Sequence, residues 1–199
     1  MSLPSRRAHP LVVRLTHWVN AVAITLMVGS GWGIYNASPL LPVRFPPWAT
    51  LGGWLGGSIA WHLAAMWLLA GNALVYLGYG LASRHLARDL LPVTPRSVLA
   101  DLRAALRFQL PHQPGHYNAV QKLLYLMVLG FGALAVVSGL VLWKPVQLHG
   151  LAWLLGGYPV VRWLHFVAMS GIVGFVAIHL ALVALVPKTL PPMITGRAR

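Results

Sequence analysis

The stretch that decides the fold reads VVRWLHFVAMSGIVGFVAIHLALVALV and covers residues 160–186. Its single charged residue is Arg162, and it holds two histidines, His165 and His179. About 20 apolar residues suffice for a helix to cross the hydrocarbon core of a bilayer, so this stretch can span one. Fourteen steps of roughly 100° come within about 40° of four whole turns, which puts both histidines on one helix face, about 21 Å apart. The stretch therefore predicts a membrane helix with imidazoles at two depths.

Three more apolar stretches accompany it, at about residues 11–35, 57–81 and 119–143. The chain has 199 residues, of which 58% are hydrophobic and 9% are charged. A soluble domain carries about 25% charged residues, so this composition is typical of a membrane protein. Lipid cannot satisfy open backbone groups, which favours helices. We predict an all-α, integral membrane, up-down four-helix bundle that forms a single domain over residues 1–199.

The basic residues predict how the chain is threaded. Twelve of the fifteen Lys and Arg residues lie at the two ends of the chain or in and beside the central link. The other three are Arg44, Lys144 and Arg162. The positive-inside rule then places the N-terminus, the C-terminus and the central link in the cytoplasm. The net charge of +13 is thus explained by membrane orientation and lipid headgroups rather than by nucleic acid.

The central link contains one further predicted helix. The segment TPRSVLADLRAALRFQ, residues 94–109, begins with Thr94 as a helix N-cap and Pro95 at the first helical position. Its apolar residues recur on one face, with Arg103 and Arg107 off that face. We expect a short interfacial helix on the cytoplasmic membrane surface. The chain has no cysteine, which excludes disulfides, iron–sulfur clusters and covalently attached c-type haem.

Four histidines lie inside the predicted spans. They are His17, His62, His165 and His179. An ionisable side chain at membrane depth is a functional hypothesis by default, because it is costly without a partner. With the predicted threading, His62 and His165 lie toward the outer side, and His17 and His179 lie toward the inner side.

Several uses of these histidines are open. Each could be a structural residue hydrogen-bonded to a neighbouring helix, and histidine chains also relay protons in pumps. The chain's two acidic residues, Asp89 and Asp101, lie outside the spans, which weakens the relay, and zinc prefers one clustered tetrahedral set. Two b-type haems, each held between two imidazoles, would use all four residues.

Arg14 and Arg162 each precede a histidine of these pairs by three residues. Residues at this spacing share a helix face, so each arginine lies about one turn nearer the membrane surface. Arg14 could pair with the propionates of an inner haem and Arg162 with those of an outer haem. Both could equally be membrane anchors that extend toward water.

The whole chain resembles the bacterial dihaem cytochrome b561 and nickel–iron hydrogenase cytochrome b subunit family. The resemblance implies two b haems with the four histidines above as iron ligands. The segment GHYNAVQK, residues 115–122, is similar to a family segment that contacts quinone. This implies a quinone role for Asn118, with Gln121 and His116 as helpers, although Asn118 could also simply start a helix. GWGIYNASP (31–39) and PPMITGR (191–197) resemble the short branch that accompanies periplasmic molybdopterin oxidoreductases.

We therefore predict a multi-pass protein of the bacterial inner membrane that is an electron-transfer subunit rather than a complete enzyme. It would pass electrons between quinone and a periplasmic redox protein, either a molybdopterin oxidoreductase or a c-type cytochrome. One alternative is a stand-alone superoxide:quinone oxidoreductase of the same architecture. The other is a haem-free membrane anchor or small-molecule channel with structural histidines.

Overall fold

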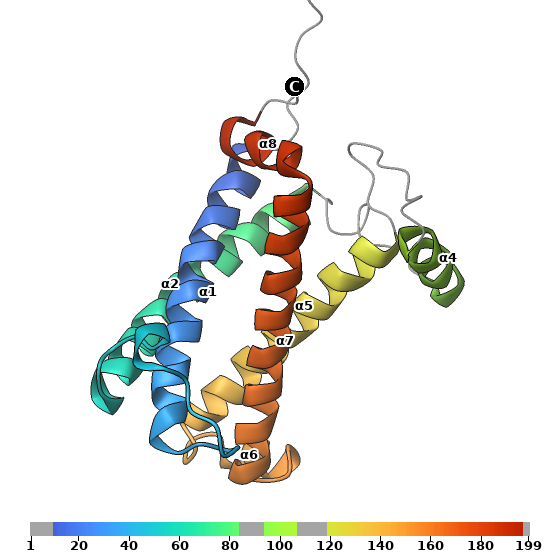
Figure 1. Cartoon of the computed structure of the whole chain (residues 1–199). Coiled ribbons are helices and arrows are strands. Elements are labelled where there is room, and N and C mark those ends of the chain that lie inside the picture. Colours follow the sequence, from blue (N-terminus) through green and yellow to red (C-terminus); the bar gives the residue numbers. More distant parts are fainter. Residues whose placement is uncertain (1–9, 84–93, 107–118, 197–199) are drawn as a thin grey trace, which may run out of the picture. The chain divides into compact units, whose positions relative to one another are not determined.

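Four long helices dominate the computed structural model, which describes residues 10–83, 94–106 and 119–196 (Figure 1). These helices are α1 (Leu11–Ala37), α2 (Leu55–Ala82), α5 (Ala119–Trp143) and α7 (Tyr158–Leu185). Each is long and apolar enough to cross a membrane. The predicted all-α class and the four spans are confirmed, with helix ends that differ by at most two residues from those expected. The orientation of the termini stays a prediction.

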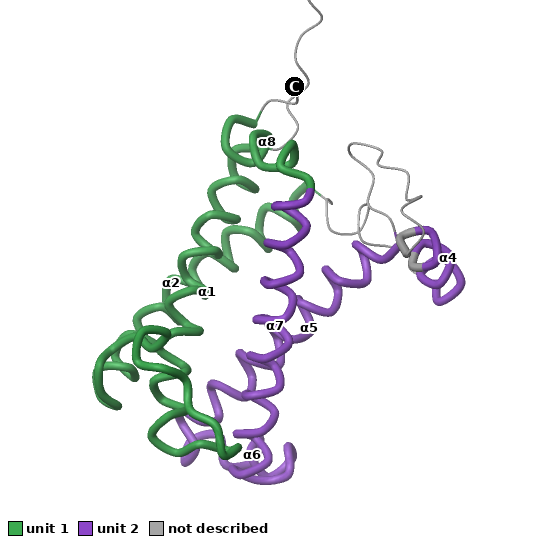
Figure 2. Tube along the Cα trace, viewed as in Figure 1, with its two compact units in different colours: residues 1–83, 186–199 green, residues 84–185 purple. Residues whose placement is uncertain are grey.

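Within the described residues, five short helical elements join or follow the spans. They are η1 (Pro47–Ala49), α4 (Pro95–Leu106), α6 (His149–Leu154), η2 (Pro187–Thr189) and α8 (Leu190–Thr195). The chain forms two compact units, drawn in different colours in Figure 2. Unit 1 comprises residues 1–83 and 186–199, and unit 2 comprises residues 84–185. The prediction of a single domain remains a prediction.

In unit 1, α1 packs against α2 through small and polar side chains. The buried residues of α1 recur every seven positions, and so do three of those in α2: Thr16, Ala23 and Ser30 on α1, and Ser58, Ala65 and Asn72 on α2. A period of seven keeps one stripe of each helix facing its partner. Small side chains in that stripe let the two backbones approach closely, as is usual between membrane helices.

An asparagine cluster lies within the α1–α2 contact. The Asn72 side-chain amide donates to the backbone oxygen of Thr16 at 2.8 Å and to Oδ1 of Asn20 at 2.6 Å. Asn72 is 9% exposed, so these bonds are shielded from water and from lipid. They fix the axial position of α2 relative to α1, because both acceptors belong to α1.

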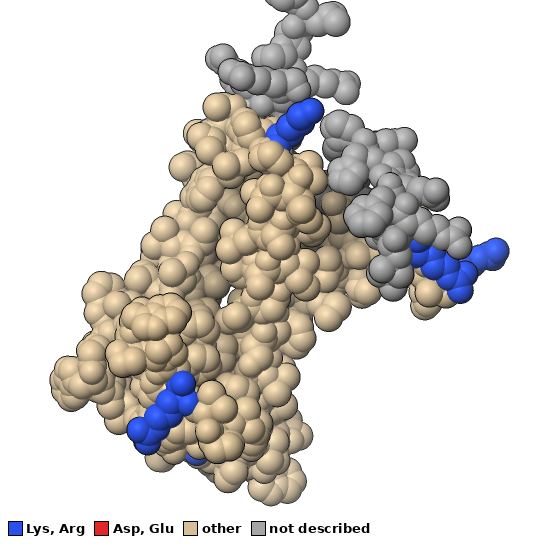
Figure 3. Space-filling model, in the orientation of Figure 1, with Lys and Arg blue, Asp and Glu red and all other residues tan. Residues whose placement is uncertain are grey.

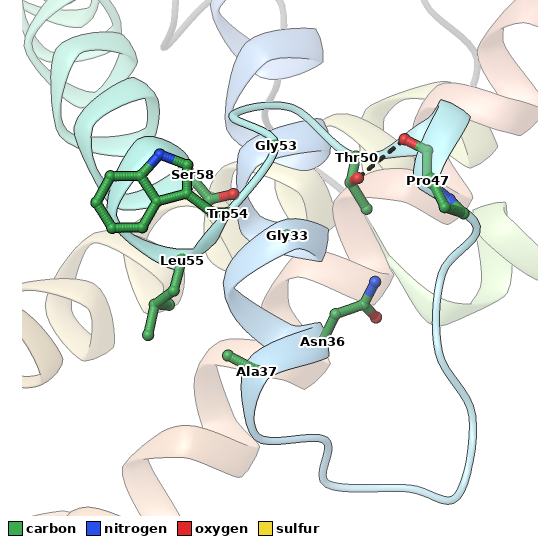
Figure 4. A pocket seen from close by; sticks show the side chains of 9 residues that line it. All are labelled: Gly33, Asn36, Ala37, Pro47, Thr50, Gly53, Trp54, Leu55 and Ser58. Atoms are coloured by element: carbon green, nitrogen blue, oxygen red, sulfur yellow. Dashed lines mark hydrogen bonds between the residues drawn. The ribbon is translucent and has the colours of Figure 1, made fainter.

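The loop after α1 folds back over the end of that helix. The Asn36 amide donates to the Phe45 backbone oxygen at 2.8 Å and accepts from the Phe45 backbone N–H at 2.9 Å. The Phe45 ring stacks on Trp32, with 4.4 Å between centroids. A cavity of about 290 Å³ lies beside Asn36, lined also by Thr50, Trp54 and Ser58 among others (Figure 4). This loop therefore forms an ordered cap on one end of unit 1.

The C-terminal segment also belongs to unit 1 and contacts α1. The Arg14 guanidinium donates to the backbone oxygens of Met193 and Ile194, and the Trp18 indole N–H donates to Met193 at 3.3 Å. The helix α8 then ends at Gly196, whose φ of 75° is the left-handed conformation that glycine adopts readily. A cationic side chain at a helix C-terminus satisfies its last carbonyls and complements its dipole. The sequence pattern predicted no element of secondary structure for this tail.

In unit 2, α5 packs against α7 around a second set of small residues. The buried residues are Ser138 and Val141 on α5, and Val161 and Ala168 on α7. The α6–α7 connection turns at Gly156 and Gly157, whose φ values of 92° and 91° favour glycine. This tight turn brings α7 back along α5.

The helix α4 confirms the predicted cap and provides a cap for another helix. Thr94 and Ser97 bond reciprocally, each side-chain oxygen accepting the other's backbone N–H at 3.2 Å. The Asp101 carboxylate accepts the backbone N–H of Ala119, the first residue of α5, at 2.6 Å. A carboxylate is favourable at a helix N-terminus, where unpaired N–H groups and the helix dipole are positive. Asp101 thus joins α4 to the start of α5.

Large apolar side chains cover the long helices on their outward faces. Leu74 of α2 is 73% exposed and Leu185 of α7 is 78% exposed. On the face drawn in Figure 3, Lys and Arg side chains gather near helix ends and the stretch between them is uncharged. This pattern suits helices surrounded by lipid, where an exposed apolar side chain carries no free-energy penalty.

Candidate functional site

All four predicted ligand histidines lie on the long apolar helices. His17 is in α1, His62 is in α2, and His165 and His179 are in α7. Each ring is partly buried. The helices therefore place imidazole nitrogens, which can ligate a metal ion or a haem iron, in an apolar environment.

Two of these histidines are held in the same way, one in each unit. Nδ1 of His62 lies 3.0 Å from the hydroxyl oxygen of Ser30 on α1. Nδ1 of His165 lies 3.0 Å from the hydroxyl oxygen of Ser138 on α5. Both serines are 0% exposed. In each unit, a serine of the first long helix fixes the ring of a histidine on the second long helix.

A glycine follows each of these serines and borders the same imidazole. A Cβ added at Gly31 would lie 3.4 Å from Cε1 of His62, and one at Gly139 would lie 3.1 Å from Cε1 of His165. The second distance is tighter than ordinary van der Waals contact. A larger residue at position 139 would therefore push the His165 ring out of its place.

The other two histidines have aromatic neighbours. The His179 ring stacks on Phe175, with 6.0 Å between centroids and 9° between the planes. Phe175 in turn lies 6.3 Å from Tyr125 of α5. The His17 ring meets Trp18 edge-on at 5.4 Å. His17 and His179 thus each lie beside an aromatic side chain of their own helix.

The two arginines predicted to serve haem propionates lie one turn before their histidines. Arg14 bonds the C-terminal carbonyls of α8, which accounts for one use of its guanidinium. Arg162 is partly exposed on α7. The propionate role of both residues stays a prediction.

The predicted quinone residues are only partly within the described structure. Asn118 and His116 lie outside the described residues. Gln121 lies in the first turn of α5, two residues after Ala119, which Asp101 caps. Its quinone role likewise stays a prediction.

The donor set suits haem better than a protein-ligated metal ion. Within residues 10–83, 94–106 and 119–196, no group of three or more His, Cys, Asp or Glu side chains could hold a metal ion. The zinc alternative therefore gains no support from this part of the chain. Trp32, in the same turn of α1 as Ser30, has a buried indole N–H that lacks a hydrogen-bond partner among the described residues. A buried donor of this kind fits a site that takes up an additional polar group.

Sequence reasoning missed Ser30 and Ser138. A Ser-Gly dipeptide occurs three times inside the spans, at positions 30, 138 and 170. The third copy has another role, because a Cβ added at Gly171 would lie 2.5 Å from the Phe131 ring. The dipeptide alone therefore could not have identified the residues that meet the histidines.

Comparisons with known proteins identify the family of this chain. The family description "Prokaryotic cytochrome b561" matches residues 8–196. A curated protein of Azospira oryzae is 50% identical over 189 residues, which cover 94% of this chain and 96% of the relative. That relative carries the provisional name protein-methionine-sulfoxide reductase subunit YedZ1. No solved structure matches the chain. This integral membrane chain belongs to the prokaryotic cytochrome b561 family.

Proposed function

We propose that this chain is the membrane subunit of a protein-methionine-sulfoxide reductase and passes electrons from quinol to a periplasmic partner. Membership of a cytochrome b family implies haem b and a role in an oxidoreductase. The observation that carries the proposal is the placement of four histidines on three apolar helices in a chain of this family.

We assign the histidines to two haems. His62 and His165 would ligate an outer haem, and His17 and His179 an inner haem. Support comes from their depths in the predicted threading, and from the shared serine contact of His62 and His165. When bound, the haems supply one-electron redox chemistry. The protein supplies the ligands, their orientation and an apolar path across the membrane.

Arg14 and Arg162 would neutralise haem propionates near the two membrane surfaces. A charged hydrogen bond is roughly twice as strong as a neutral one, so an arginine is a suitable partner for a carboxylate. The bonds of Arg14 to α8 are compatible with this role, because a guanidinium has five N–H donors.

Quinone would react near the cytoplasmic end of α5. Asn118, Gln121 and His116 are the proposed contacts, because amide and imidazole groups donate hydrogen bonds to quinone oxygens. Gln121 lies two residues after Ala119, whose backbone N–H is held by Asp101, so this end of α5 has a fixed start on which such a site could be built.

The partner and the direction follow from the name of the relative. Reduction of a methionine sulfoxide to methionine takes up two electrons and two protons and releases one water. A membrane subunit of such a reductase must therefore deliver electrons, which sets the direction from quinol outward. We propose a periplasmic molybdopterin oxidoreductase as the acceptor. The excess of Lys and Arg on the opposite side supports an outward-facing partner surface at the α1–α2 and α5–α7 links.

The test begins with a haem count by pyridine haemochrome on protein purified in detergent from haem-replete cells. Two haems per chain are expected. His165→Ala should remove the outer haem alone, and His17→Ala the inner haem alone. A colourless preparation would contradict the proposal and favour the haem-free anchor.

The second step adds a quinol and a purified periplasmic reductase. Oxidation of quinol through the chain and the reductase should continue only while a protein-bound methionine sulfoxide is present as the final electron acceptor. Rapid quinone reduction by superoxide, with no partner added, would instead favour the stand-alone oxidoreductase. Asn118→Ala should slow the reaction with quinol and leave the haem count unchanged.

A further inference from the structure

The serine–histidine contacts in the two units share more than a distance. Each serine lies on the first long helix of its unit and each histidine on the second, and the hydroxyl oxygen meets Nδ1 at 3.0 Å in both. Each serine is followed by a glycine that borders Cε1 of the same ring. The two helix pairs thus hold an imidazole through the same set of contacts.

The direction of these hydrogen bonds follows from the proton count. The Ser30 hydroxyl lies 2.5 Å from the backbone oxygen of Leu26, and the Ser138 hydroxyl lies 2.5 Å from that of Leu134. A carbonyl can only accept, so each serine donates its single proton to its own helix. The serine oxygen must then accept from Nδ1–H of the histidine.

The tautomer of each histidine is therefore set. With the proton on Nδ1, the lone pair of the neutral imidazole is on Nε2. A ligating histidine commonly donates its other ring N–H to a protein acceptor, which fixes the ring and raises its basicity. The serine contact provides such an acceptor for both His62 and His165.

The surroundings keep each serine in this position. Ser30 and Ser138 are 0% exposed. Ser30 is also one of the buried α1 residues that recur every seven positions in the contact with α2. Each also remains within reach of a second carbonyl, at 3.2 Å for Ser30 and 3.3 Å for Ser138. The acceptor is thus fixed on a rigid helix and does not depend on a mobile side chain.

We infer that Ser30 and Ser138 are positioning residues that orient the two iron ligands of the outer haem and lower its reduction potential. This inference rests on the proposed haem ligation. A hydrogen bond from Nδ1–H makes the imidazole a stronger electron donor, which favours ferric over ferrous iron. Because both proposed ligands of the outer haem have the same serine contact, the two serines should act on the reduction potential of that one haem. Their effects on this potential should add.

The test uses the full chain with the substitutions Ser30→Ala, Ser138→Ala and both together. Redox titration followed at the haem α-band resolves the outer and inner components. Each single substitution should raise the reduced-to-oxidised ratio of the same component at a fixed ambient potential. A tenfold rise would be about 59 mV for a one-electron couple. The inner component should not move.

Two further variants separate orientation from stability. Ser58→Ala is the matched control, because Ser58 is 2% exposed and its hydroxyl is bonded to the Leu51 backbone oxygen instead of a histidine ring. It should leave both potentials unchanged. Ser30→Cys keeps the size of the side chain but has a weaker acceptor, so it should give an intermediate shift.

The outcomes distinguish the inference from the proposed function. A shift no larger than that of Ser58→Ala, in a chain that still binds two haems, would overturn the inference alone. An unsubstituted chain without haem would overturn the proposed function. Shifts of two different components would support the positioning role but refute the assignment of His62 and His165 to one haem.

Discussion

Replacement of Asn72 by alanine tests how the first two helices are held together. The Asn72 amide donates two hydrogen bonds to α1, to the Thr16 backbone and to the Asn20 side chain. A hydrogen bond between membrane helices contributes about 0.6 kcal/mol on average and about 1.7 kcal/mol at most. Two such bonds at a site that is 9% exposed give an expected loss of about 1–2 kcal/mol in the free energy of unfolding.

A double-mutant cycle with Asn20→Ala isolates one of the two bonds. The coupling energy should be about 0.6 kcal/mol, because only the 2.6 Å bond joins these side chains. Unfolding would be followed by circular dichroism in mixed micelles with increasing dodecyl sulfate.

The matched control for this experiment is Thr25→Ala. Thr25 is exposed, and its hydroxyl donates within α1 to the Ala21 backbone at 2.8 Å. Its removal should change the free energy of unfolding by less than about 0.5 kcal/mol. If Asn72→Ala were as stable as Thr25→Ala, or the coupling were zero, the asparagine cluster would not hold the helices.

Three more substitutions test other contacts. Gly33→Ala should destabilise unit 1 by about 1–3 kcal/mol in the same unfolding assay, because the new Cβ would lie 2.3 Å from the Ser58 hydroxyl. Its control is Gly71→Ala, where the new Cβ has no neighbour within 4 Å and the change should be neutral or stabilising. Asp101→Asn should destabilise the start of α5 by about 0.3–1 kcal/mol, because it removes a negative charge from the helix N-terminus. Hydrogen exchange in the first turn of α5 should become faster, and unchanged rates would contradict the role of Asp101. Arg14→Gln should release α8 and speed its hydrogen exchange roughly fivefold, which corresponds to a loss of about 1 kcal/mol in the free energy of local opening. Unchanged protection of α8 would show that the guanidinium bonds do not hold it.

The sequence alone predicted the features that depend on local composition. The four apolar stretches gave helix ends within two residues of those in the structure, and Thr94 and Pro95 start α4 as expected. Hydropathy acts over one continuous stretch of about 20 residues and capping acts within one helical turn, so both can be read along the chain. The four histidines were found in the same way, because an ionisable residue in an apolar stretch is conspicuous.

The tail after residue 186 shows where local reading fails. No secondary structure was predicted for the segment PPMITGR, and two adjacent prolines usually interrupt a helix interior. In the structure these prolines occupy the first turn of α8, where their missing N–H groups do no harm. The helix is then held by Arg14, which is 179 residues away from Met193 in sequence. A contact of that range has no local signal.

Only the tertiary structure decided which side chains support the histidines. The Ser-Gly dipeptide occurs three times within the spans, yet two copies meet a histidine and the third borders Phe131. Which neighbour a residue meets depends on the rotation and axial position of one helix against another. Those are set by the packing of α1 on α2, whose buried residues are mostly small, and by the Asn72 bonds, which join residues far apart in the chain. The sequence thus determined the membrane helices and the ligand candidates, while packing between helices determined how the ligands are held.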